Sequence, residues 1–126
     1  MFELRSHTID TLLAALSNPS RRYTTYILLS QPQLTVEQLA ARLHRIDADA
    51  AEMGDTDRSS IEISLVHNHL PRLADAGLIE YDPRSGELRR NDLESERWAY
   101  VEELYRMEFD EATLTEATAL ENVSSE

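Results

Sequence analysis

The chain has 126 residues, with 24 acidic side chains, 12 arginines and no lysine or cysteine, so its formal net charge is −12. This length suits one domain with appendages, and the absence of cysteine excludes disulfides and thiolate metal sites. No apolar run approaches the roughly 18 residues of a membrane-spanning helix, and the start lacks the segments of a signal peptide, so we expect a cytoplasmic protein without a membrane partner.

The charge has an unusual composition, because every basic side chain is arginine. Arginine carries a delocalised, weakly hydrated charge and pairs with carboxylates through two hydrogen bonds. In molar salt the Debye length falls to about 3 Å, which screens the self-repulsion of an acidic surface. The composition therefore favours a halophilic protein, with chance lysine depletion as the alternative. Residues 92–126 hold 11 acids and two arginines, whereas residues 58–91 balance five acids with five arginines.

Three helices are expected in the N-terminal half, over residues 8–16, over residues 20–30 and from residue 35 onward. Asn18 is a favoured N-cap for the second helix, and Pro19 is a favoured first residue. Thr35 and Gln38 have the spacing of a capping box at the start of the third. The expected inward-facing residues are Ile9, Leu12, Leu13, Leu16, Tyr23, Tyr26, Ile27, Leu39, Ala40 and Leu43.

Residues 46–60 separate the third helix from the next and are rich in aspartate. We expect a solvated acidic insertion, in which the third helix extends to Met53 and a loop follows at Gly54. A calcium-binding loop is the alternative. The glycine and glutamate spacing of an EF-hand loop is absent, so no metal is predicted.

A fourth helix is expected from Ser59 or Ser60 to Ala76, where Gly77 can adopt the left-handed conformation of a C-terminal cap. Helical spacing predicts a buried stripe made by Ile63, Val66, Leu70 and Leu73. The outer face then carries Ser64, His67, Asn68, Pro71 and Arg72. Pro71 removes one backbone hydrogen bond and is expected to bend the helix.

A short hairpin is expected after Gly77. Residues 78–81 alternate as a strand, residues 83–86 have the composition of a turn, and residues 87–90 return. A helix that leads into a two-stranded ribbon predicts a winged helix-turn-helix over residues 1–91, with flanking N- and C-terminal helices. The fold class is therefore mainly α with a small β-hairpin (α+β).

Residues 92–109 are expected to form a C-terminal dimerisation helix, whose apolar face carries Trp98, Val101, Leu104 and Tyr105. Such a face either folds onto its own domain or pairs with a second copy, and we favour a homodimer. Residues 110–126 contain five acids and no base, so we expect an acidic, disordered tail.

Three segments resemble arsenic-repressor-like (ArsR) winged-helix regulators. His69-Leu-x-x-Leu-x-x-Ala-Gly-Leu-Ile resembles the end of their recognition helix, and Leu16-Ser-Asn-Pro-Ser-Arg-Arg-Tyr resembles the opening of their first conserved helix. Leu34-Thr-Val-Glu-Gln-Leu-Ala resembles the helix that leads into the helix-turn-helix. The chain is similar, more closely still, to short haloarchaeal winged-helix proteins of unassigned function. The resemblance implies that His67 and Asn68 reach base edges and that His69 has a structural role.

The function expected from these features is sequence-specific binding of double-stranded DNA by a homodimeric transcriptional regulator. Base contacts are assigned to Ser64, His67 and Asn68. Phosphate contacts are assigned to Arg72, Arg84, Arg89 and Arg90. Arg21, Arg22 and Arg58 lie near helix starts and either bind phosphates or form ion pairs, and Arg22 can form a salt bridge within the fold.

The alternative function is a winged-helix module that contacts another transcription protein and does not bind DNA. A continuous positive strip from helix to wing would favour DNA, whereas interruption of that strip by Asp75, Glu80 and Glu87 would favour a protein partner. No motif for catalysis or cofactor binding is present, so we expect neither an enzyme nor a cofactor. His67 and His69 point to nearly opposite sides of a helix and make a poor metal pair.

Overall fold

The computed structural model describes residues 6–50, 57–93 and 95–110. In chain order, the elements are α1 (Ser6–Leu16), α2 (Pro19–Ser30), β1 (Gln33–Thr35), α3 (Val36–Ala50), α4 (Arg58–Ser64), the π-helical turn η1 (Leu65–His69), α5 (Leu70–Asp75), β2 (Ile79–Asp82), β3 (Glu87–Arg90), α6 (Ser95–Tyr105) and the π-helical turn η2 (Arg106–Asp110).

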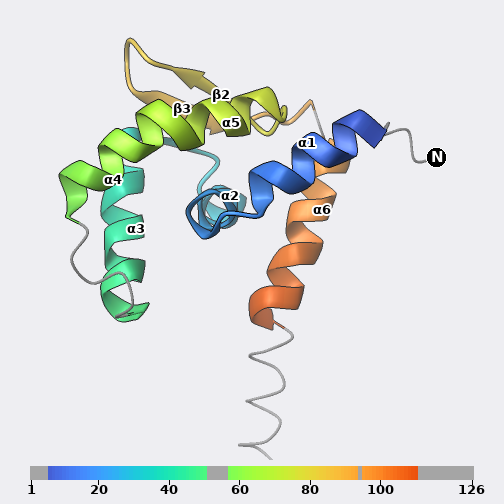
Figure 1. Cartoon of the computed structure of the whole chain (residues 1–126), viewed down its shortest axis with the longest axis horizontal. Helices are drawn as coiled ribbons and strands as arrows, with labels where there is room; N and C mark the ends of the chain where they lie inside the picture. The colour runs from blue at the N-terminus through green and yellow to red at the C-terminus, as the bar shows by residue number, and fades with distance from the viewer. Residues whose placement is uncertain (1–5, 51–56, 94, 111–126) are drawn as a thin grey trace, which may run out of the picture.

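The elements surround α2, with α3 and α4 on one side and α1 and α6 on the other (Figure 1). Together α4, η1 and α5 form one continuous rod, which we call the recognition helix. The β2–β3 hairpin, which we call the wing, lies against α5. The predicted fold class, mainly helical with a small antiparallel β-structure in a winged-helix arrangement, is confirmed.

The sheet has one strand more than the predicted hairpin. All pairs are antiparallel in the order β1–β3–β2, with Leu34 and Tyr81 both opposite Leu88. No strand was predicted over the residues of β1, because a three-residue strand has too short a pattern to recognise. Its pairing fixes the wing to the start of the helix-turn-helix.

The helix ends follow local sequence signals. The side chain of Asn18 accepts a hydrogen bond from the backbone N–H of Ser20 at 2.8 Å. The capping box is present, because the Gln38 side chain accepts from Thr35 N–H at 2.9 Å and the Thr35 hydroxyl accepts from Gln38 N–H at 3.1 Å. Gly77 has a φ of 78°, as a left-handed cap requires. These three predictions are confirmed.

The recognition helix buries most of the expected stripe, because Leu70 and Leu73 are fully buried and Val66 packs against the core. Ile61, Leu65 and Leu70 are buried, whereas Ile63 is 60% exposed, so its assignment to the core was wrong. At about 100° per residue, Ile61 and Leu70 would lie on opposite sides of a regular α-helix. In η1 the backbone N–H of Leu70 donates to the carbonyl of Leu65, which accommodates one extra residue and brings Leu70 to the side of Ile61 and Leu65.

Pro71 gives a physical reason for this turn. A proline inside an α-helix has no N–H to donate, and its ring collides with the carbonyl four residues earlier, here that of His67. The wider turn of η1 ends at His69, and α5 begins at the next residue with Pro71 in its first turn. The helix therefore continues past Pro71 as a single rod (Figure 1).

The C-terminal helix folds back onto its own domain. Trp98 is 2% exposed and donates through its indole N–H to the carbonyl of Leu78 at 3.0 Å, and Val101 is fully buried. The expectation that Trp98 and Val101 form a dimer interface is therefore corrected, because the protomer itself covers them. Leu13, expected to face inward, is instead 53% exposed.

Several sequence expectations lie outside the described residues. They include the order of the acidic insertion over residues 51–56 and the tail from residue 111 onward. Asp57, the last acid of the insertion, is the N-cap of α4, where its carboxylate accepts from Ser60 N–H at 2.8 Å. Among the described helices, none is both long enough and apolar enough to cross a membrane.

Candidate nucleic-acid interface

Four polar side chains form an exposed row on the recognition helix. They belong to Ser64, His67, Asn68 and Arg72, and all four are exposed. Apart from Ile63, the apolar side chains of the same helix pack into the body of the protein, so this row points away from it. The structure therefore brings together the predicted helix residues on one accessible face, which we call the polar row.

Two members of the polar row contact each other. The Nε of Arg72 donates to Oδ1 of Asn68 at 2.7 Å, across one helical turn. An amide oxygen accepts two hydrogen bonds and an amide nitrogen donates two, so this contact leaves Asn68 free to accept one more bond and to donate. The contact orients the two exposed side chains relative to each other.

His69 lies on the opposite side of the helix and is held by Arg21. The histidine is 8% exposed, and its Nδ1 lies 3.1 Å from Nη1 of Arg21. Arginine can only donate, so Nδ1 accepts and the ring proton resides on Nε2. Arg21 also donates to the carbonyls of Ala15 and Ala14, at 2.6 and 3.3 Å.

This buried contact connects the recognition helix to the corner between α1 and α2. Burial, followed by the positive charges of Arg21 and Arg72, lowers the pKa of His69. The imidazole is therefore neutral, as the acceptor role requires. The structural role implied for His69 agrees with its burial. Arg21 also has a structural role, because its guanidinium bonds His69 and two backbone carbonyls and is not available to a phosphate.

The three wing arginines differ in their availability. Arg89 forms an exposed ion pair with Glu80 at 2.6 Å. Arg90 pairs with Asp92 at 2.9 Å, and its guanidinium lies 4.7 Å from the centre of the Trp98 ring. Arg84 occupies the turn of the wing, is exposed, and forms no ion pair with any described residue.

The assignment of Arg90 to phosphate binding is corrected by these contacts. Its side chain is 22% exposed, and a stacked, paired guanidinium must lose both contacts before it can reach a phosphate. Arg89 must exchange Glu80 for the phosphate, so among the wing arginines only Arg84 has no ion pair with a residue that the structure describes.

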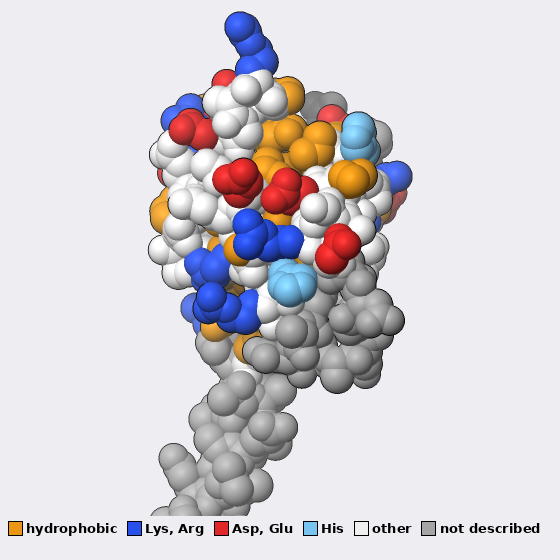
Figure 2. Space-filling model, turned by 90° about the vertical axis from the view of Figure 1, so that its left-hand side faces the viewer, with side chains coloured by type: hydrophobic (Ala, Val, Ile, Leu, Met, Phe, Trp, Pro, Cys, Tyr) orange, Lys and Arg blue, Asp and Glu red, His pale blue; other side chains and the backbone are white. Residues whose placement is uncertain are grey.

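Acidic and basic side chains alternate over the end of the molecule that α3 and α4 form, and no single basic patch covers it (Figure 2). Asp75, Glu80 and Glu87 are exposed along the helix and the wing, so they interrupt a positive strip. The electrostatic attraction of this face for a polyanion is therefore weak.

Ile63 is a candidate contact residue that helical spacing had placed in the core. It is exposed one residue before Ser64, at the N-terminal end of the polar row. An apolar side chain in this position can contact the methyl group of thymine in a major groove. Pro71 was the signal that could have revealed it, because the turn before a proline changes which residues face outward.

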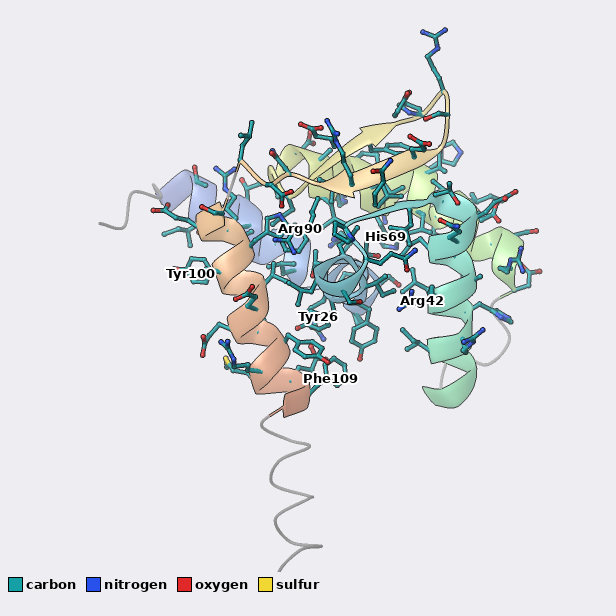
Figure 3. The ribbon with its side chains drawn as sticks, turned by 180° about the vertical axis from the view of Figure 1, so that it is seen from behind. Tyr26, Arg42, His69, Arg90, Tyr100 and Phe109 are labelled. Atoms are coloured by element: carbon teal, nitrogen blue, oxygen red, sulfur yellow. The ribbon has the colours of Figure 1, made fainter. Side chains whose placement is uncertain are left out.

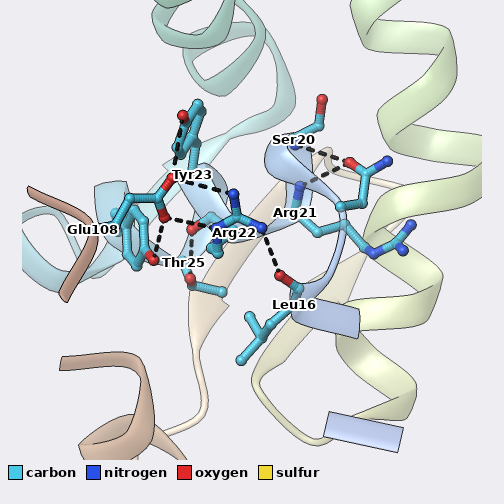
Figure 4. A network of polar contacts seen from close by, with 9 residues as sticks. Leu16, Ser20, Arg21, Arg22, Tyr23, Thr25 and Glu108 are labelled. Atoms are coloured by element: carbon cyan, nitrogen blue, oxygen red, sulfur yellow. Dashed lines mark hydrogen bonds and ion pairs between the residues drawn. The ribbon is translucent and has the colours of Figure 1, made fainter. Parts of the chain in front are cut away.

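Arg22 takes the intramolecular alternative left open by the sequence. Its Nε and Nη2 donate to the carboxylate of Glu108 at 2.7 and 3.1 Å, and its Nη1 donates to the carbonyl of Leu16 at 3.0 Å (Figure 4). The hydroxyls of Tyr26 and Tyr23 donate to the same carboxylate at 2.8 and 3.4 Å. We call these five groups the Glu108 network.

The comparisons with known proteins identify a family. The family described as Domain of unknown function (DUF7344) matches residues 13–89, which is more than half of the chain. The chain belongs to this family. No curated protein and no solved structure matches it.

The DUF7344 match contains the whole polar row, Arg84 and Arg89, whereas Arg90 and the C-terminal helix α6 lie beyond it. Within the described residues of this DUF7344 protein, no group of three or more histidine, cysteine, aspartate or glutamate side chains is arranged to hold a metal ion. His67 is exposed and His69 is buried, so these two side chains do not face a common site.

Proposed function

We propose that the protein is a sequence-specific DNA-binding transcriptional regulator that acts as a homodimer in a high-salt cytoplasm. The observation that carries this proposal is the polar row, which is exposed on the second helix of a helix-turn-helix. Such a helix fits the major groove, where hydrogen-bonding groups distinguish the four base pairs. No polar-row residue except the Asn68–Arg72 pair has a hydrogen bond to another described side chain.

Asn68 and Arg72 act as the central reading unit in this proposal. Asn68 is suited to adenine, with which it can form two hydrogen bonds. Arg72, assigned to a phosphate from the sequence alone, lies against Asn68 and is proposed here to bind guanine instead, through two hydrogen bonds. Ser64 and His67 extend the contacts toward the start of the helix, and Ile63 supplies an apolar contact. Arg84 is the wing residue assigned to a phosphate.

High salt determines which of these contacts gives affinity. Each neutralised phosphate lowers log K by about 0.9 per unit of log salt concentration, so phosphate contacts contribute little in molar salt. A good bidentate base contact contributes roughly 1–3 kcal/mol of discrimination. A face with few free arginines is thus suited to recognition through base edges under these conditions.

The dimer surface in this proposal consists of α1, the end of α6 and η2. Leu13 and Met107 are 53% and 59% exposed, and both line a shallow hollow together with Leu104. Apolar surface of this kind is removed from water by a second copy, at about 25 cal/mol per Å². A two-fold dimer would present two recognition helices to a palindromic site.

Binding measurements on the intact chain test the proposal. Fluorescence anisotropy in molar potassium chloride should show tighter binding to DNA upstream of the protein's own gene than to a scrambled duplex. Asn68→Ala should reduce that preference by about tenfold, which corresponds to one bidentate contact. Arg84→Ala should weaken binding to both duplexes equally and reduce the salt dependence.

Arg106→Ala is the matched control for the loss of one arginine charge. Arg106 is exposed on η2 and pairs only with Glu103 among the described residues. It should leave binding to both duplexes unchanged. If Asn68→Ala preserves the ratio of the two affinities, the polar row does not read the bases.

A protein-docking function is the second candidate, favoured by the pairing of Arg89 with Glu80 and by the interrupted positive strip. In this case the polar row would contact another transcription protein. Failure of the wild type to bind either duplex at any salt concentration would select this candidate.

A further inference from the structure

A wide groove lies between α2, α3 and the end of α6, on the other side of α3 from the recognition helix. Its volume is about 550 Å³, and it is lined by Tyr23, Tyr26, Ile27, Ser30, Arg42, Ile46, Tyr105 and Phe109. Tyr26, Phe109 and Arg42 are labelled around the opening between α6 and α3, below α2 (Figure 3). Ligand sites of proteins typically have volumes of roughly 300–1,000 Å³, so a small organic molecule fits.

One wall of the groove is a cluster of aromatic rings. The ring of Tyr26 lies 5.3 Å from that of Tyr105 and 5.5 Å from that of Phe109, and Tyr105 and Phe109 are also 5.5 Å apart. Tyr23 joins the cluster 5.8 Å from Phe109. These separations suit edge and tilted ring contacts, and a flat ring placed in the groove would extend the same packing.

The polar ends of two rings are already satisfied elsewhere. The hydroxyls of Tyr23 and Tyr26 both donate to Glu108, and Arg22 neutralises that carboxylate. Burial and the hydrogen bond to Glu108 raise the pKa of Tyr26, so its ring remains uncharged. This wall therefore presents carbon surface and no unpaired negative charge from the Glu108 network.

A positive charge lies on the α3 side of the groove. Arg42 is exposed and donates through Nη1 to the side-chain oxygen of Gln31 at 2.6 Å. This contact orients the guanidinium but does not neutralise it. In the part of the chain that the structure describes, no carboxylate forms an ion pair with Arg42. A neutral amide on one side leaves the other donors of the guanidinium available for a carboxylate.

We propose that this groove binds a planar aromatic carboxylate, with its ring against Tyr26, Tyr105 and Phe109 and its carboxylate on Arg42. The apolar wall provides burial for the ring, and the single uncompensated cation selects an anion over a neutral analogue. The site is distinct from the polar row, and the inference does not depend on DNA binding.

Titration of the full chain with 1-naphthoate tests this site. Binding is measured by calorimetry and by the NMR signals of the aromatic protons. We expect saturable one-to-one binding that shifts the ring signals of Tyr26, Tyr105 and Phe109. The uncharged analogue 1-naphthamide should bind about fivefold more weakly, since it lacks the ionic component of the charge-assisted hydrogen bond.

Variants separate the charge from the shape of the groove. Arg42→Gln should reduce naphthoate affinity to that of naphthamide and leave naphthamide binding unchanged. Arg45→Gln is the matched control, because Arg45 is exposed on the same helix but does not line the groove. Ser30→Trp should prevent binding of both compounds, because Ser30 is exposed and a large side chain there fills the groove.

Four results would overturn the proposal. The first is equal affinity for naphthoate and naphthamide, and the second is an Arg45→Gln effect as large as that of Arg42→Gln. The third is the absence of saturable binding at millimolar probe. The fourth is a dissociation constant that rises with protein concentration, which would assign the groove to a second copy of the chain instead. None of these measurements includes DNA, so this site and the proposed function can fail separately.

Discussion

Replacement of Glu108 by glutamine should detach the end of the C-terminal helix from α2. The carboxylate accepts two hydrogen bonds from Arg22 and one each from the hydroxyls of Tyr26 and Tyr23. Glutamine has the same shape as glutamate but no charge, and its amide nitrogen cannot accept a hydrogen bond. The variant therefore leaves the Arg22 guanidinium without an anionic partner.

The size of the effect follows from the burial of this pair. Loss of one partner costs about 3–5 kcal/mol when an ion pair is fully buried, and an exposed pair contributes only about 0.2–1 kcal/mol. The side chains of Arg22 and Glu108 are 22% and 25% exposed, so we expect an intermediate loss of about 2 kcal/mol. For a domain of this size the melting temperature should fall by about 8 °C.

Urea unfolding monitored by tryptophan fluorescence is a suitable assay, because Trp98 is the single tryptophan and is buried where α6 meets the body. Glu103→Gln is the matched control on the same helix, since Glu103 pairs only with the exposed Arg106 among the described residues. It should change the unfolding free energy by less than about 0.5 kcal/mol. Equal destabilisation by the two variants would refute this account of the Glu108 network.

The pH dependence of the same variant provides a second check. Hydrogen bonds from Arg22, and then from Tyr26, lower the pKa of Glu108 despite partial burial. Its contribution to stability is therefore complete above the pKa of an unfolded glutamate, about 4.3, and is lost as the pH falls through the lower folded-state pKa. The stability difference between wild type and Glu108→Gln should narrow in this acid range.

Three further predictions concern other parts of the fold. Gly77→Ala should destabilise the protein by about 1–2 kcal/mol in urea unfolding, because φ is 78° there and a Cβ would collide with Nη1 of Arg97; a neutral effect would mean that the turn relaxes. Burial and then the charges of Arg21 and Arg72 lower the pKa of His69, so wild-type stability should decrease below pH of about 6.5. His69→Gln should reduce that decrease, and identical pH profiles would exclude this histidine as the cause. With 24 acids against 12 arginines, the melting temperature should be lower in dilute buffer than in molar potassium chloride, and coincident melts would contradict a halophilic origin.

Features that depend on a few adjacent residues could be predicted from the sequence. The caps at Asn18 and Gly77 and the box formed by Thr35 and Gln38 involve bonds across two to five residues, so their chemistry is visible in a short segment. The polar row also followed from helical spacing. Its residues remain outward because the opposite face of the same helix is apolar.

Features that join distant segments could not be predicted. Arg22 and Glu108 are separated by 86 positions, and nothing in either segment identifies the partner. Arg90 illustrates the same limit, because its stacking on Trp98 depends on where α6 packs. The burial of Trp98 likewise required knowledge of whether its helix would fold onto its own domain or onto a second copy.

The π-helical turn also determines where the recognition helix tolerates a change in length. Deletion of one residue within Leu65–His69 would place Ile61 and Leu70 eight positions apart, and a regular α-helix separates such residues by only about 80°. Because Pro71 blocks the α-helical hydrogen bond four residues back, the helix could keep its buried contacts by becoming wholly α-helical only where this proline is replaced as well. A deletion within α4 instead rotates the residues before it by about 100° relative to the body of the protein. Single-residue deletions in related sequences should therefore be found at η1 and be rare in α4, because only deletions at η1 keep Ile61 and Leu70 on the same side of the helix.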